Sequence, residues 1–534
     1  MSKNKYRLLI LLLFATGLVV FYHIIFTYMP KALVLWDEAA NLFWASEFVQ
    51  AVTKRDTNLL LSNLRGQNYF PPFGTLPLAI PTLLFGESVY ALRAFNVVFT
   101  FLALLVLYKL VNLLINKGDK QKLAFALVGF FYILSPMVIM HASVVLKEPL
   151  GAFLTLLVTF THIKGGRSLR PRVLVGILLV LLVFTKYNYG FYVWLALLIE
   201  TVYLVALGGK RINKKEVFGH TVGLVMPVFA MAIWVWFIGG AITDVFTKQI
   251  EMTKDIGSYF DKALFYPKSL IYIYSPSVIL GLLQIFGFLL AFKKFGHVKW
   301  RFMLMLVLTN FILVGLWTNN LHDRYIFTVM PLFYLTSAVA LVDNWHLIKK
   351  GIRKLPAFIA PSLLLVFVVL LVKDILGLPK RVYGLGAYTL RSPVFNQVDY
   401  VDTWFNYTSD RWAYDIPDDG YSRPEDVFNF VFEHVETAKP VELIGWSNEL
   451  SPRYFHYLQF HHKAYNGSVF GAEKYIVTLK FLPESKFRTR DFALTNDKEQ
   501  ARVLAVEKMD ELTLIARKPF FDIGVEATVF ASKN

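Results

Sequence analysis

The sequence predicts a polytopic α-helical membrane protein, with about eleven transmembrane helices followed by a soluble C-terminal domain. Apolar residues make up 56% of the 534 residues and charged residues only 17%, whereas an ordinary soluble domain has about 25% charged residues. The net charge of +17 is unevenly divided, because residues 1–376 hold 36 basic and 16 acidic side chains while residues 377–534 hold 19 and 22. Positive charge that gathers between apolar runs is a topology signal, so nucleic-acid binding is not expected.

Eleven apolar runs are long enough to cross the hydrocarbon layer, which takes ~20 residues. The first follows the basic segment Met1–Arg7. It is too long for the apolar part of a signal peptide and lacks a small-x-small cleavage site, so we expect it to be retained as a span. The predicted spans are residues 7–29, 89–115, 122–141, 147–163, 172–186, 188–208, 217–239, 270–292, 301–318, 325–346 and 355–376.

A further apolar run, Thr75–Phe85, is short and contains Pro77 and Pro81, so we expect an interfacial or re-entrant helix there. With the N-terminus in the cytoplasm, 22 of the 36 basic residues of the membrane half fall on the cytoplasmic side, as the positive-inside rule requires. Counting the short run as a crossing would move every later basic cluster outside. This topology in the plasma membrane places the loop 31–88 and everything after about residue 377 on the extracytoplasmic side.

The sequence thus divides into a transmembrane domain, residues 1–376, and an extracytoplasmic soluble domain, residues 377–534. A capping-box pattern from Ser422 to Glu425 predicts a helix through about Glu436. Helical and strand-like segments alternate, which is typical of a small α/β or α+β domain. Strands are expected at Val441–Trp446, Lys474–Leu479, Arg502–Val506 and Leu512–Ala516.

An acidic pair, Asp37 and Glu38, directly follows the first span. Adjacent carboxylates beside hydrocarbon are costly unless they are solvated or used, and a solvated loop start is the simpler interpretation. The rest of this outer loop favours a functional role, because carboxylates on a loop lying flat on the bilayer suit an enzyme whose substrate is presented at the interface. The segment Ala39–Gln50 looks amphipathic, with apolar side chains for the membrane surface at Leu42, Phe43, Ala45 and Val49.

Other charged residues lie at the predicted outer ends of spans. Glu148 opens the fourth span, where a carboxylate also stabilises a helix N-terminus. Lys186 closes the fifth span, and Arg93 and Arg324 lie at the outer ends of the second and tenth. Each cation alone is typical of an interfacial anchor. Together the three would bind an anionic head group, since a guanidinium group donates two parallel hydrogen bonds to a phosphate.

Aromatic residues make up 16% of the chain, and most are typical of interfacial belts and lipid-facing packing. Tyr187, Tyr189 and Tyr192, near Lys186, have the alternative role of a wall on which a sugar stacks.

No cofactor is assigned with certainty. The chain has no cysteine, which excludes disulfides, thiolate catalysis and Cys-ligated zinc. A divalent cation bridging Asp37 and Glu148, with His141 or His322 nearby, stays an open alternative, although no ligand-spacing motif is present.

The order of short motifs along residues 7–345 resembles the C-class (GT-C) membrane glycosyltransferases. Most similar is the branch of protein O-mannosyltransferases (dolichyl-phosphate-mannose-protein mannosyltransferase-like) and lipid A aminoarabinose transferases. The resemblance lies in an acidic pair after the first span, a Pro-Pro helix, Gly-x-Ser before Ala-Leu-Arg, Leu-Ser-Pro before Lys-Glu-Pro, Thr-Lys-Tyr, and Asp-Arg-Tyr before Met-Pro-Leu.

The resemblance implies a GT-C fold and a role for each matching residue. Asp37 matches the catalytic carboxylate of the family, with Glu38 as second choice. Glu148 matches an acidic residue of the second outer loop and is the third catalytic candidate, although relatives often have Asp-Pro there instead of Glu-Pro. The basic positions associated with the lipid phosphate match Lys186, Arg93 and Arg324.

The implied activity is inverting transfer of a sugar from a polyprenyl-phosphate carrier to a glycan, lipid or protein acceptor on the outer face of the membrane. A polytopic transporter or lipid flippase is the alternative. Transporters place charges near the bilayer midplane and often have repeated halves, whereas here the charges gather at one face and no repeat is evident. A receptor or assembly scaffold that uses the C-terminal domain is a third interpretation.

Overall fold

The structure is a computed structural model, and it describes the larger part of the chain. The described residues lie in the stretches 15–115, 118–207, 214–238, 266–317, 323–346, 359–376, 424–435, 441–445, 475–481, 493–521 and 525–532. Some of these stretches are interrupted by one to four residues that the structure does not describe.

The chain divides into two compact units. The first is drawn from Met1–Thr27, Leu64–Pro77 and Arg93–Val382, and the second from Tyr28–Asn63, Leu78–Leu92 and Tyr383–Asn534. Residues 28–63 and 78–92 thus group with the C-terminal region. The domain boundary at 376/377 stays a prediction.

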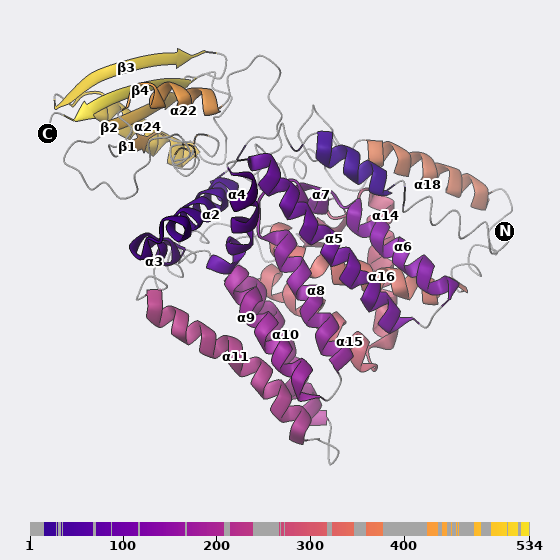
Figure 1. The fold of residues 1–534 in the computed structure, drawn as a ribbon. Coiled ribbons are helices and arrows are strands. Elements are labelled where there is room, and N and C mark those ends of the chain that lie inside the picture. Colours follow the sequence, from indigo (N-terminus) through magenta and orange to yellow (C-terminus); the bar gives the residue numbers. More distant parts are fainter. Residues whose placement is uncertain are drawn as a thin grey trace. The chain divides into compact units, whose positions relative to one another are not determined.

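The first unit is a bundle of long apolar helices (Figure 1). Five described helices are long and apolar enough to cross a membrane, and the bent pair α6–α7 makes a sixth. The chain is therefore a mostly helical membrane protein. The helices are α5 (Val89–Leu114), α6 (Asp119–Ile133), α7 (Pro136–Ala142), α8 (Glu148–Gly165), α9 (Leu169–Thr185), α10 (Tyr187–Leu207), α11 (Lys214–Ile238), α14 (Val278–Ala291), α15 (Val298–Ile312), α16 (Met330–Asp343) and α18 (Ile359–Leu376).

These helices fall on the predicted apolar runs, with four local differences. The run 122–141 is bent by 65° between α6 and α7, where Pro136 takes the first helical position because its missing N–H does no harm there. α14 begins eight residues after the predicted start of its run. The last turn of α15 continues as a π-helical segment, Leu313–Trp317, and a 3-10 helix, η7 (Asp323–Val329), precedes α16.

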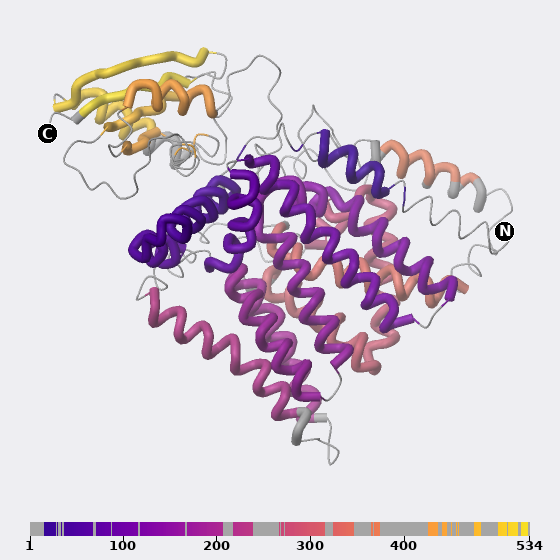
Figure 2. The backbone as a smooth tube through the Cα atoms, in the orientation of Figure 1, coloured from indigo at the N-terminus to yellow at the C-terminus, as the bar shows by residue number. Residues whose placement is uncertain are grey.

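α8, α9 and α10 run along one another in the bundle, and α11 packs against α9 (Figure 2). Small residues allow the last contact. A Cβ atom at Gly223 of α11 would lie 3.1 Å from the carbonyl oxygen of Arg172, and one at Gly176 of α9 would lie 3.2 Å from Gly223 Cα. Such close approach is typical of helix pairs inside membranes.

In the second unit, α2 (Trp36–Lys54) and α3 (Thr57–Gly66) are joined by a tight turn, and α2 packs against α4 (Ala79–Phe85). Asn63 donates hydrogen bonds to the Trp44 carbonyl (3.1 Å) and to Glu47 Oε2 (2.8 Å). Burial raises the pKa of Glu47, and the hydrogen bond from Asn63 opposes that rise.

The amphipathic pattern expected for α2 is wrong in part. Leu42 and Ala45 are buried rather than exposed, because α2 is covered by neighbouring segments such as α4. The short helix α4 instead carries the exposed apolar surface, and it begins after a 3-10 turn, η3 (Leu76–Leu78). Its exposed side chains are Ile80, Leu83, Leu84 and Phe85.

The C-terminal region contains a four-stranded mixed sheet in the order β1-β2-β4-β3, with β1 and β2 parallel and the other pairs antiparallel. The strands are β1 (Val441–Ile444), β2 (Tyr475–Phe481), β3 (Leu512–Phe520) and β4 (Val525–Ser532), and the helices are α22 (Pro424–Phe432) and α24 (Ala493–Val506). The chain leaves β1 through Gly445 at φ +82°, where a Cβ atom would lie 2.2 Å from the Leu479 carbonyl oxygen. Only glycine fits this turn.

Three of the four predicted strands are present, and the fourth prediction is wrong. Arg502–Val506 is the last part of α24, and the sequence analysis did not predict β4. Gln500 of α24 accepts a hydrogen bond from the Phe481 N–H (2.9 Å) and donates one to the Leu479 carbonyl (3.0 Å). These bonds tie the helix to the end of β2. The capping residue Ser422 lies outside the described residues, and α22 ends before Glu436.

Candidate active site

Three of the predicted site residues, Glu148, Lys186 and Tyr189, meet at one end of the helical bundle. Glu148 is the first residue of α8. Lys186 stands between α9 and α10 in an extended backbone conformation, and Tyr189 lies in the first turn of α10. Residues 38 positions apart in the chain are thus brought together because α8 begins where α9 ends.

The contacts within this group are short and buried. Lys186 Nζ lies 3.2 Å from Glu148 Oε1, with the lysine side chain 13% exposed and the glutamate 2%. The Tyr189 hydroxyl donates to the same carboxylate oxygen at 2.8 Å and lies 3.4 Å from Lys186 Nζ. An ion pair at this depth is retained only when its members are mutually satisfied, so the three side chains form one polar unit.

Local sequence explains why these side chains fit together. A carboxylate in the first turn of a helix interacts favourably with the helix dipole, which suits Glu148 to the start of α8. Gly151, almost one turn later, leaves room for the tyrosine ring, since a Cβ atom there would lie 2.6 Å from Tyr189 Cδ2.

Aromatic rings flank the lysine. Lys186 Nζ lies 5.1 Å from the centre of the Tyr189 ring and 5.7 Å from that of Tyr325, both within the range of a cation–π interaction. Tyr187 is held differently, because its hydroxyl accepts a hydrogen bond from Trp234 Nε1 of α11 at 2.8 Å. Tyr325 and Trp234 were not among the predicted site residues, although Tyr325 directly follows the predicted Arg324.

Two more predicted residues belong to the same electrostatic environment. Glu148 interacts with His141 and Arg324 as well as with Lys186. Arg324 is half-buried in η7. His141, fully buried at the end of α7, stacks on Phe327 with ring centres 4.8 Å apart.

The hydrogen bond of His141 defines its tautomer. Its Nδ1 lies 3.0 Å from the Met137 carbonyl, which can only accept, so Nδ1 carries the proton. Among the described residues its Nε2 has no hydrogen-bond partner.

For the remaining predicted residues except His322, the structure gives the position and burial. Arg93 is buried on α5. Asp37 and Glu38 lie in the first turn of α2, in the second compact unit, where Asp37 is half-buried and Glu38 buried. His322 lies outside the described residues.

Hydrogen-bond donors contact Oε1 of Glu148 in the described part of the structure, namely an ammonium group and a phenolic hydroxyl. No group of three or more His, Asp or Glu side chains suited to a metal is found in the part of the chain that the structure describes. A cation at Asp37 and Glu148 therefore stays a prediction, and no step of the chemistry is derived through it.

The comparisons with known proteins concern the fold. No protein-family model and no curated protein sequence matches the chain. Among solved structures, ArnT from Cupriavidus metallidurans in the apo state matches at a TM-score of 0.59 and 15% identity, with 97% of each chain covered. ArnT bound to undecaprenyl phosphate matches at 0.58 and 14%, again with 97% of each chain covered.

Archaeal oligosaccharyltransferase AglB from Archaeoglobus fulgidus, in complex with an inhibitory peptide and a dolichol-phosphate, matches at a TM-score of 0.49 and 12% identity, over 90% of this chain and 70% of that one. The match to ArnT extends over nearly the whole of both chains. The resemblance that the order of motifs predicts is therefore confirmed for the fold: this chain has the GT-C fold that ArnT, a lipid A aminoarabinose transferase, also has.

Proposed function

We propose that the protein transfers a sugar from a polyprenyl-phosphate carrier to an acceptor on the extracytoplasmic face of the membrane. The observation that carries the proposal is the buried group of Glu148, Lys186 and Tyr189, with Arg324 in electrostatic contact. The fold supports it, since ArnT, which has the same fold, has been solved with undecaprenyl phosphate bound.

The proposal includes the topology derived from sequence. Eleven crossings with a cytoplasmic N-terminus bring the start of α8 and the end of α9 to the outer side, and the C-terminal domain lies on that side as well. A lipid-linked donor in the outer leaflet would then present its phosphate at the level of Lys186.

In the proposed reaction an acceptor hydroxyl attacks the anomeric carbon while the bond from that carbon to the phosphate oxygen breaks. Direct displacement inverts the anomeric configuration and needs one base, unlike the carboxylate pairs of retaining glycosidases. Asp37 is the proposed base that takes the hydroxyl proton, with Glu38 as the second candidate. Negative charge grows on the departing phosphate, and Lys186, Arg93 and Arg324 are the proposed cations that stabilise it.

Glu148 takes a positioning role in this scheme. Its carboxylate oxygen is engaged by Lys186 and by the Tyr189 hydroxyl, so it is poorly placed to act as a base. It keeps the ammonium group at one depth and orientation between the rings of Tyr189 and Tyr325. Tyr187 and Tyr189 are the proposed stacking surface for the sugar. The acceptor class is a glycan, a lipid or a protein.

The experiment is sugar transfer by the purified full-length protein, supplied with polyprenyl-phosphate-linked sugars and membrane extract, with products identified by mass spectrometry. We expect Asp37→Asn to lose at least about a hundredfold in rate, because removal of a general base typically costs 10²–10⁴-fold. Binding of the carrier lipid and the unfolding temperature should stay close to those of the unchanged protein.

Glu38→Gln is the matched control, since it neutralises the neighbouring carboxylate of the same helical turn. If only Glu38→Gln loses transfer, Glu38 rather than Asp37 is the base. Full activity in both variants would contradict the proposed chemistry. Flux of the lipid across vesicles without any acceptor would instead favour a transporter.

A further inference from the structure

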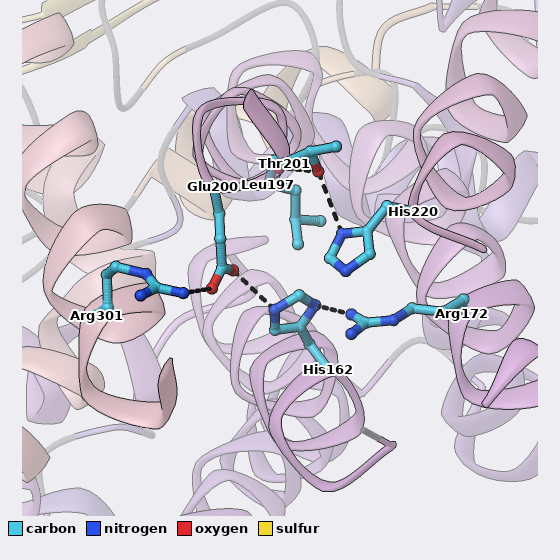
Figure 3. Close-up of polar contacts among 7 residues, drawn as sticks. All are labelled: His162, Arg172, Leu197, Glu200, Thr201, His220 and Arg301. Atoms are coloured by element: carbon cyan, nitrogen blue, oxygen red, sulfur yellow. Dashed lines mark hydrogen bonds and ion pairs between the residues drawn. The ribbon is translucent and has the colours of Figure 1, made fainter. Parts of the chain in front are cut away.

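A second buried polar cluster lies near the other end of the same helices (Figure 3). We call it the inner cluster; it consists of His162, Arg172, Glu200, His220 and Arg301, each at most 6% exposed. None of these residues belongs to the candidate active site.

Five helices contribute one residue each, namely α8, α9, α10, α11 and α15. Along α8, Glu148 and His162 are 14 residues apart, which is about 21 Å at 1.5 Å per residue. His162 lies in the last turn of α8 and Arg172 in the first turn of α9, so the cluster is close to the end of the bundle. In the proposed topology this end faces the cytoplasm.

Hydrogen bonds define the protonation of His162. Its Nδ1 faces an Arg172 terminal nitrogen, and its Nε2 lies 2.8 Å from Glu200 Oε2. A guanidinium group can only donate, so Nδ1 must accept and Nε2 must carry the proton that is given to the carboxylate. His162 is therefore neutral, and it connects Arg172 to Glu200 by accepting a hydrogen bond from the first and donating one to the second.

Arg301 is left with unused donors. One terminal nitrogen lies 3.5 Å from Glu200 Oε1 without forming a hydrogen bond, and the guanidinium carbon lies 4.6 Å from the centre of the Tyr203 ring. Among the described residues, Arg301 Nε and that terminal nitrogen have no hydrogen-bond partner, although the side chain is only 5% exposed. A buried guanidinium group with unmet donors is costly. Glu200 Oε2 is shared with His162, and Oε1, the ion-pair partner of Arg301, forms no hydrogen bond within the described residues.

His220 is also buried with one nitrogen unmet, and in Figure 3 it lies on the other side of Glu200 and His162 from Arg301. The Thr201 hydroxyl donates to the Leu197 carbonyl at 2.7 Å, so its oxygen accepts the Nδ1 proton of His220 at 3.1 Å. Within the described part of the chain, His220 Nε2 has no partner, and the imidazole ring stands edge-on to that of His162 at 5.5 Å.

We propose that the inner cluster is a phosphate-binding site. A phosphate group has oxygen acceptors for the two unmet donors of Arg301 and matches the fork of a guanidinium group. Its negative charge offsets the guanidinium that Glu200 compensates only in part.

The test measures thermal unfolding of the purified full-length protein while inorganic phosphate replaces chloride at constant ionic strength. A ligand that binds the folded state raises the unfolding temperature saturably. The Lys186→Met variant is the background, because it removes a cation of the candidate active site. The expected result is a saturable rise in the unfolding temperature that persists in this background. Because Lys186 is absent there, the result does not depend on whether the proposed function is correct.

Arg301→Gln, added to that background, should weaken the phosphate response at least about tenfold, since it removes charge-assisted hydrogen bonds. Arg301→Lys keeps the charge but loses the fork, and it should weaken the response in the same direction even where the glutamine variant does not fold. Arg170→Gln is the matched control, because Arg170 is an exposed arginine on the first turn of α9; its response should be unchanged. An equal response in the Arg301 variants would overturn the proposal.

Nanodiscs distinguish the source of the phosphate group. Stabilisation by free phosphate in detergent assigns the site to a soluble ligand. Stabilisation only in nanodiscs of phosphatidylcholine with phosphatidic acid, and not in phosphatidylcholine alone, assigns it to a lipid head group with a phosphomonoester. No Arg301-dependent stabilisation in either setting would overturn the proposal.

Discussion

Lys186 is held from several sides at once. The carboxylate of Glu148 lies 3.2 Å away, and the rings of Tyr189 and Tyr325 lie within about 6 Å of the ammonium group. An ammonium group with so little solvent depends on its counter-charge, because desolvation of each ion costs several kcal/mol before pairing. The position of the cation is therefore a property of the whole group.

This dependence predicts a non-additive pair of substitutions. Glu148→Gln should destabilise the protein by about 3–5 kcal/mol, since it leaves Lys186 charged and buried without its partner. The double variant Glu148→Gln with Lys186→Met removes both charges and should recover most of that loss. The measurement is a denaturant titration of the purified protein in detergent micelles. A double variant that is less stable than Glu148→Gln would show that the pair is not energetically coupled.

Sequence reasoning identified the members of this group but not their pairing. Glu148 and Lys186 were predicted from charge at the ends of spans, and Tyr189 from its nearness to Lys186 in the chain. Their contact depends on the packing of α8 against α9, which no local pattern specifies. The same limit explains Tyr187, two residues earlier, which bonds to Trp234 of α11 instead. The inner cluster was missed because its five residues come from five helices.

At the scale of elements, the turn between α9 and α10 is the tightest constraint near the site. Lys186 is the single residue between these helices. At Gly190, in the first turn of α10, a Cβ atom would lie 2.1 Å from Val183 Cγ2 and 2.6 Å from Val183 Cα. Because backbone atoms are involved, a rotamer change alone cannot relieve the clash.

Gly190→Ala should therefore destabilise the protein by about 1–3 kcal/mol, as overpacking of a close helix contact does. Gly66→Ala is the control, since nothing lies within 4 Å of a Cβ atom there; it should leave stability unchanged or slightly higher. Thermal unfolding of the two variants in detergent measures the difference. Equal unfolding temperatures would mean that α9 and α10 separate more easily than their packing indicates.

Most elements were predictable because apolar runs of membrane length have few alternative structures. The errors lie where burial depends on neighbours. Arg502–Val506 is a short apolar run that suits a strand or a helix equally, and Gln500 holds it as a helix against β2. Leu42 was expected at a membrane surface but is buried, in a helix that packs against α4.

At the scale of the whole molecule, the absence of cysteine makes the proposed topology directly testable. Single cysteines can be introduced at Ser62 of α3 and at Gly296 before α15, both of which are exposed. On intact cells a membrane-impermeant maleimide should label Ser62→Cys, and it should label Gly296→Cys only after permeabilisation. Labelling of both positions from outside would contradict eleven crossings.

The fold itself was predicted from the order of short motifs rather than from any one of them. The match to ArnT, at a TM-score of 0.59 and 15% identity, confirms the fold.

α8, α9 and α10 run from the end of the bundle that holds the candidate active site to the end that holds the inner cluster. α8 contributes Glu148 and His162 to the two polar groups, and α10 contributes Tyr189 and Glu200. α9 contributes Arg172 and ends directly before Lys186. We expect a displacement of these helices that changes anion binding at one end to change anion binding at the other end. By thermodynamic reciprocity, whatever factor inner phosphate applies to donor affinity, a bound donor applies to phosphate affinity.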